Sequence, residues 1–197
     1  MYNVKKLDEL ADNINGDPVK AFDALIALGF LYESGNEGIP NDWEKALSNY
    51  ERATHINTPE VNREQAFLSI SRLCHKMCLA TDDNLPDLKE SFATYCREKC
   101  PVNLVTKCGN PEIALFVGEI CEHMAEYYLN GSSPSRPNAV REYYAYAMLY
   151  YVHALEMNSE TSTIDCHLLD DKCKAMQARL ILLKSTTKNT ASPHSKI

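Results

Sequence analysis

The sequence predicts an all-α protein built from helical hairpins. Apolar residues recur three and four positions apart along most of the 197-residue chain, which is the spacing of one helix face. β-Branched residues are scattered, and no hairpin dipeptide stands between two alternating runs, so no strand is predicted. The predicted hairpins return about every 40 residues, and a period of that length indicates a repeat architecture.

Two helices are predicted before the first loop. Residues 3–14 place their apolar side chains on one side of a short helix, which the sequence NGDP then ends. Asp17 is expected to cap the second helix, with Pro18 at its first position, where the missing N–H costs nothing. That helix is expected to run to about Glu33, with Gly35 as a left-handed C-cap.

The remaining helices follow from the same kinds of signal. Asn41 and Glu44 form a capping-box pattern before a helix that runs to about His55. Further helices are predicted at 60–80, 87–99, 111–129, 139–157 and 163–184, with a linker at 100–111 and a disordered Ser/Thr-rich tail at 185–197. The last helix has a single apolar face, as expected of a terminal cap.

Charge and hydropathy exclude several classes of partner. The formal net charge is -7, so the surface repels nucleic-acid phosphates and anionic lipids, and no nucleic-acid partner is expected. The N-terminal sequence turns acidic at once and has no apolar segment of the kind found in secretory signals. No apolar run approaches the roughly 18 residues needed to span a bilayer. These features predict a cytoplasmic location without membrane insertion.

One stretch carries a dense pattern of small, aromatic and charged residues. Its members are Ala24, Leu28, Gly29, Tyr32, Gly35, Gly38, Ile39, Asp42, Lys45, Ala46, Leu47, Tyr50 and Ala53. Over residues 21–54 this pattern closely resembles the SEL-one-like repeat, a relative of the tetratricopeptide repeat. The one departure is an extra residue between Gly35 and Gly38.

The resemblance extends to the other hairpins in weaker form. In the third hairpin Met124, Ala125, Tyr128 and Gly131 occupy the Leu-Gly-Tyr-Gly positions, and Ala147, Tyr151 and Ala154 keep the spacing of Ala46, Tyr50 and Ala53. In the second hairpin the corresponding residues are Ile70, Ser71 and Cys74. The resemblance implies a short right-handed α-solenoid of about three helix-turn-helix repeats, near 20–56, 60–100 and 111–157, with terminal capping helices in one domain at 1–184.

What the resemblance implies about function is binding. Solenoids of this kind offer a concave surface, lined by the inner helices, to a peptide or protein partner. SEL-one-like repeats are also frequent in bacterial proteins that act on host partners, so the resemblance leaves open an effector that is exported without a cleavable signal peptide.

The sequence carries no catalytic or cofactor-binding motif. Gly29, Gly35 and Gly38 lie six and three residues apart, which fits neither a P-loop nor a dinucleotide-binding loop, and no strand precedes them. No Ser–His–Asp or Cys–His arrangement can be argued from the histidines. We therefore expect no enzyme activity and no cofactor.

The cysteines permit an alternative function. Cys74 and Cys78 are four residues apart on one predicted helix, and Cys96 and Cys100 are four apart on the next. If these helices are antiparallel partners, the four sulfurs can converge on a metal ion or form disulfides, which would make the protein a cysteine-dependent metal-binding, redox or assembly factor. The other interpretation is that these cysteines continue apolar stripes and act as small core residues. Both interpretations stay open at this point.

Two stripes are candidates for a partner-binding surface. Their residues are Phe22, Ile26, Phe30 and Glu33 in the first hairpin and Tyr143, Tyr146 and Tyr150 in the third. The first stripe lies beside a core stripe on a helix that is apolar nearly all round, so it is either covered or presents a binding face. The tyrosines either contact a partner or pack against the next helix. The predicted function is a non-enzymatic protein–protein interaction scaffold or adaptor.

Overall fold

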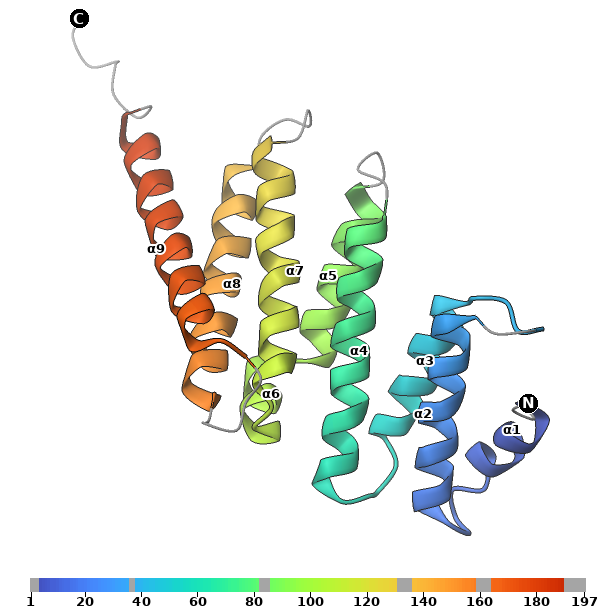
Figure 1. Cartoon of the computed structure of the whole chain (residues 1–197). Coiled ribbons are helices and arrows are strands. Elements are labelled where there is room, and N and C mark those ends of the chain that lie inside the picture. Colours follow the sequence, from blue (N-terminus) through green and yellow to red (C-terminus); the bar gives the residue numbers. More distant parts are fainter. Residues whose placement is uncertain (1–3, 36–37, 82–85, 131–135, 159–163, 190–197) are drawn as a thin grey trace, which may run out of the picture.

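The computed structural model describes residues 4–35, 38–81, 86–130, 136–158 and 164–189 (Figure 1). Within these ranges the structure contains helices and no strand, which confirms the prediction of an all-α protein. None of the helices described here is long and apolar enough to cross a bilayer. The helices are α1 (Val4–Asp12), α2 (Pro18–Ser34), α3 (Trp43–Thr54), α4 (Glu60–Ala80), α5 (Pro86–Lys99), α6 (Val102–Cys108), α7 (Pro111–Asn130), α8 (Pro137–Met157) and α9 (Cys166–Asn189).

The long helices form two rows. Figure 1 shows α2, α4, α7 and α9 in front and α3, α5 and α8 behind them, with α1 beside α2 at the N-terminal end. Each rear helix packs against the two front helices that flank it in the sequence. Within the front row α4 packs closely against α7 but only lightly against α2. This light contact leaves the space in which the candidate site lies.

The core has two parts. A small cluster joins α1 to α2 and includes Ala11, Phe22 and Leu25. A much larger cluster runs from α3 to α9. It contains the whole predicted apolar face of α4, which consists of Phe67, Ile70, Leu73, Cys74, Met77 and Cys78. The helical spacing of the sequence therefore identified the buried face of α4 correctly.

Two glycines inside front helices let a tyrosine from the rear row come close. A Cβ on Gly29 of α2 would lie 2.3 Å from the Tyr50 ring, and one on Gly118 of α7 would lie 2.6 Å from the Tyr151 ring. Both distances are shorter than side chains tolerate, so each position requires glycine while its tyrosine stays in place. In the third hairpin the resemblance placed Ala125, and not Gly118, at the position that corresponds to Gly29.

The ends of α2 and α3 agree with the predictions only in part. Asp17 caps α2 as expected, because its carboxylate accepts the backbone N–H of Lys20 at 3.1 Å, and Pro18 is the first helical residue. Gly35 has the expected positive φ of 62°, but its ψ of 126° lies outside the left-handed helical region. The predicted capping box at Asn41 is wrong. Asp42 caps α3, and Asn41 instead donates a hydrogen bond to the carbonyl of Glu33 at 2.7 Å.

Two other boundaries need correction. The predicted linker at 100–111 contains α6, which begins after Pro101 and ends at Gly109, a residue with a φ of 69°. Seven residues are too few for a helical pattern to stand out, although Val105 is buried. The tail predicted as disordered from residue 185 is helical up to Asn189, because α9 runs to that residue. The rest of the predicted tail, 190–197, lies outside the described residues.

Candidate functional site

The front row holds a cavity of about 490 Å³ between α2 and α4, with Tyr50 of α3 among the side chains that line it. We call this cavity the α2–α4 groove. It is lined by Asp23, Ile26, Ala27, Phe30, Leu31, Tyr50, Gln65, Leu68, Ser69 and Arg72. Its volume falls in the range of about 300–1,000 Å³ that is usual for ligand sites, and its lining combines apolar side chains with a few polar ones.

The apolar lining comes from the outer side of α2, where the sequence predicted a binding stripe. Phe30 leaves 55% of its surface exposed, and Ile26 is half-buried. Both line the groove. Phe22 does not belong to this surface, because only 1% of it is exposed and it packs in the cluster that α1 forms with α2. The predicted stripe is therefore corrected at its first residue, since α1 covers that side of α2.

Glu33, the fourth residue of the predicted stripe, is buried behind the groove and does not line it. Its carboxylate accepts a hydrogen bond from the Tyr50 hydroxyl at 2.9 Å and one from Arg72 at 3.3 Å. Lys76 lies 3.8 Å from the same carboxylate. Burial, and then the charge of Glu33, raises the pKa of Tyr50, so this tyrosine stays protonated and continues to donate.

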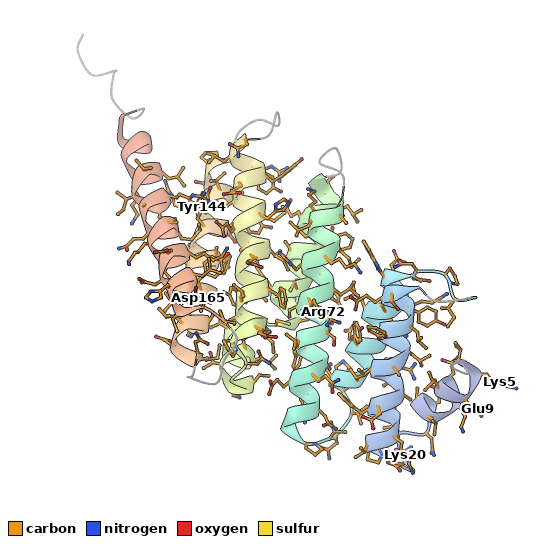
Figure 2. All side chains as sticks on the ribbon, in the orientation of Figure 1. Lys5, Glu9, Lys20, Arg72, Tyr144 and Asp165 are labelled. Carbon is orange, nitrogen blue, oxygen red and sulfur yellow. The ribbon has the colours of Figure 1, made fainter. Side chains whose placement is uncertain are left out.

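Arg72 is the charged residue that turns from this network toward the groove. It lies on α4, on the side that faces α2 (Figure 2). Its side chain is 47% exposed while one guanidinium nitrogen bonds Glu33. Lys76, one turn further along α4, has its ammonium 5.4 Å from the centre of the Trp43 ring. No pattern in the sequence singles out Arg72, because nothing in α4 indicates that α2 lies beside it.

The predicted tyrosine stripe on α8 does not form an open surface. Tyr143 and Tyr150 are buried, and Tyr150 donates a hydrogen bond to the Cys100 carbonyl at 3.0 Å. Tyr146 is half-buried, and the Arg97 guanidinium of α5 lies 4.2 Å from its ring centre. Of the two interpretations of these tyrosines, packing is the one that describes Tyr143 and Tyr150, since Tyr143 lies against Arg97 of α5 and Tyr128 of α7.

The four candidate cysteines are core thiols. Cys74, Cys78, Cys96 and Cys100 are buried, and none of these four forms a disulfide bond. Three of the four thiols meet, because Cys96 contacts both Cys74 and Cys100, whereas Cys78 lies against the Met124 sulfur at 4.0 Å. Among the described residues, no group of three or more His, Cys, Asp or Glu side chains is arranged to hold a metal ion. Burial raises the pKa of Cys78 to about 11.

The network behind the groove has a counterpart at the other end of the row. Tyr151 donates to Glu122 at 2.6 Å, and Lys172 of α9 donates to the same carboxylate at 3.1 Å. Glu122 follows Gly118 by four residues, as Glu33 follows Gly29. Each unit thus joins a glycine and a glutamate of one front helix to a tyrosine of the rear row and a cation of the next front helix. The shared spacing of glycine and glutamate was a signal in the sequence that we did not use.

Comparisons with known proteins identify no relative. No family model, no curated protein and no solved structure matches the chain.

Proposed function

We propose that the chain is a non-enzymatic interaction scaffold that binds a peptide, or a segment of a protein, in the α2–α4 groove. The observation that carries this proposal is the cavity of about 490 Å³ with Phe30 exposed at its mouth. An exposed aromatic side chain beside a preformed apolar cavity is the arrangement found where a partner inserts its own apolar side chain. A groove between two helices also suits an elongated ligand such as a peptide.

We propose further that the two rows are a short right-handed solenoid of SEL-one-like repeats, with the front row as its concave side. The repeated unit supports a repeat architecture, because Gly29, Glu33 and Tyr50 recur as Gly118, Glu122 and Tyr151 with the same roles. Gly118 stands seven residues before Ala125, the residue that the SEL-one-like pattern matches to Gly29. In repeat proteins the stacked hairpins share one continuous core, and the large cluster from α3 to α9 is of that kind. The α2–α4 groove would then lie on the surface that such proteins use for binding.

A selection from a random peptide library tests the binding proposal. The full chain is immobilised, peptides of 12 residues are selected on it, and each is measured against a Phe30→Asp variant by fluorescence anisotropy. We expect Phe30→Asp to weaken binding at least about tenfold, because it places a charge at the mouth of an apolar cavity.

Leu129→Asp is the matched control for this experiment. Leu129 lies on α7, away from the groove, and is 53% exposed against 55% for Phe30, so the two changes alter the surface to the same extent. Binding to the Leu129→Asp variant should equal that of the unchanged chain. If every selected peptide binds the Phe30→Asp variant as tightly as the unchanged chain, the groove is not the binding site.

A further inference from the structure

We propose that the occupant of the α2–α4 groove is an acidic peptide segment, which inserts an apolar side chain between α2 and α4 and places a carboxylate against Arg72 and Lys76. This inference rests on the proposed function and specifies the chemistry of its ligand. It follows from the distribution of charge around the cavity.

The end of the groove nearest the C-terminus of α2, called here its upper end, carries an excess of positive charge. Arg72 and Lys76 lie one helical turn apart on α4 and share one carboxylate, that of Glu33, at 3.3 and 3.8 Å. Arg72 lines the groove, and Lys76 lies just beyond the lining, so these two cations and Glu33 leave a net charge of +1 beside this end, on a chain whose overall charge is -7. The excess is accessible, because the side chains of Arg72 and Lys76 are each about half exposed.

Arg72 is able to bind a second carboxylate while it keeps its hydrogen bond to Glu33. A guanidinium has five N–H groups, and in the described part of the chain Arg72 uses one nitrogen, Nη2, for Glu33. Glu33, whose carboxylate is itself held by the Tyr50 hydroxyl, binds that nitrogen, so the side chain is already ordered before a ligand arrives. A preorganised arginine loses less conformational entropy when it binds a carboxylate.

The apolar and acidic parts of the ligand have separate places in the groove. Ile26, Ala27, Phe30 and Leu68 form the apolar lining, and Arg72 closes the upper end. Asp23 stands at the lower end, seven residues before Phe30 on α2, which is about 10 Å along the helix. A carboxylate at the lower end would meet Asp23, so the charges of the groove also set the direction in which an acidic segment lies.

The peptides selected above supply the probe for a direct test. Those that lose binding to the Phe30→Asp variant should contain an Asp or Glu within a few residues of an apolar residue. Changing that acidic residue to Asn or Gln should weaken binding about tenfold or more, because charge-assisted hydrogen bonds are the strong ones. On the protein side, Arg72→Gln should give a loss of the same size. Arg63→Gln, an equal charge change at an exposed position of α4 outside the groove, should change binding less than about twofold.

The outcomes separate this inference from the function on which it rests. If no peptide distinguishes the unchanged chain from the Phe30→Asp variant, the proposed function fails and the inference fails with it. If peptides bind the groove but carry basic or only neutral residues, or if the change from acid to amide has no effect, the groove binds peptides and the acidic ligand is wrong. Because Arg72→Gln also removes a hydrogen bond to Glu33, its fold is checked by circular dichroism. The peptide-side exchange decides the question if that variant is unfolded.

Discussion

Two junctions in the front row are built on the same unit, yet one is open and the other is crossed by side chains. At the first, Gly29 and Glu33 of α2 meet Tyr50 of α3 and Arg72 of α4. At the second, Gly118 and Glu122 of α7 meet Tyr151 of α8 and Lys172 of α9. The unit therefore holds three helices together in both places and does not itself decide whether a groove remains.

The side chains around the unit make the difference. At the second junction α7 presents a row of carboxylates to two cations of α9. Lys172 lies 3.5 Å from Glu119 and 3.1 Å from Glu122, and Arg179 lies 2.6 Å from Glu126. Arg179 also reaches the hydroxyl of Tyr144, which Figure 2 labels on α8. At the first junction the equivalent side of α2 carries Ile26 and Phe30, which form no such bridges, and a cavity results.

The largest expected loss of stability comes from adding a methyl group between a front helix and the tyrosine packed against it. Gly118→Ala should destabilise the fold by about 3 kcal/mol, because the new methyl group lies 2.6 Å from the Tyr151 ring and Lys172 lies over that ring. Gly29→Ala should cost only about 1 kcal/mol although its distance is 2.3 Å, since Tyr50 borders the cavity and can move into it. Chemical denaturation of both variants measures the difference.

Gly16→Ala serves as the control for these glycine variants. A Cβ there meets only the side chain of Asn13, an exposed residue that is free to turn away, so stability should change by less than about 0.5 kcal/mol. If Gly29→Ala costs as much as Gly118→Ala, the first junction is as tightly packed as the second. The comparison between the two would then fail.

A smaller loss of stability is expected when the hydroxyl group of either tyrosine is removed. Tyr151→Phe should cost about 2 kcal/mol of stability, because it removes a hydroxyl that donates to Glu122 and accepts from Lys172. Tyr50→Phe removes the hydrogen bond to Glu33 and should cost about 1.5 kcal/mol. Thermal unfolding compares both with Tyr146→Phe, where no hydroxyl hydrogen bond occurs within the described residues and a change below about 0.5 kcal/mol is expected. Equal losses for Tyr146 and Tyr151 would show that these hydrogen bonds are unimportant.

The smallest effect comes from the rear side of the first junction, where Glu51 of α3 pairs with Lys99 of α5. The hydrogen bond from Lys99 lowers the pKa of Glu51 below its ordinary value of 4.5. Because the pKa is lower in the folded state, the pair stabilises the fold above the unfolded pKa, and this contribution disappears as the pH falls through the folded pKa. Both side chains are about a third exposed, so the contribution should stay below about 1 kcal/mol.

Urea unfolding at two pH values measures this contribution. Glu51→Gln should be less stable than the unchanged chain at pH 7, and this difference should shrink as the pH falls through the folded pKa of Glu51. Glu142→Gln, at an exposed position of α8, controls for the loss of a surface charge. A difference between Glu51→Gln and the unchanged chain that persists at low pH would mean that packing, and not the ion pair, is responsible.

Local signals in the sequence were enough for most of the helices. Asp17 and Pro18 marked the start of α2, and the spacing of apolar residues marked the buried face of α4, because both depend on neighbours within a few residues. The same signals failed at Asn41, which is chemically as good a cap as Asp42. The choice between them was made by a carbonyl of α2 that Asn41 reaches in space.

The difference between what local signals predict and what tertiary contacts decide is clearer at the candidate site. The sequence alone determined that α2 is apolar on nearly every side and that Ile26 and Phe30 share one of its faces. Only the tertiary structure decided that α1 covers Phe22, that Glu33 turns inward to Tyr50, and that Arg72 faces the cavity. The physical reason is that helical periodicity assigns residues to faces, whereas the packing of other helices decides which of those faces are left open.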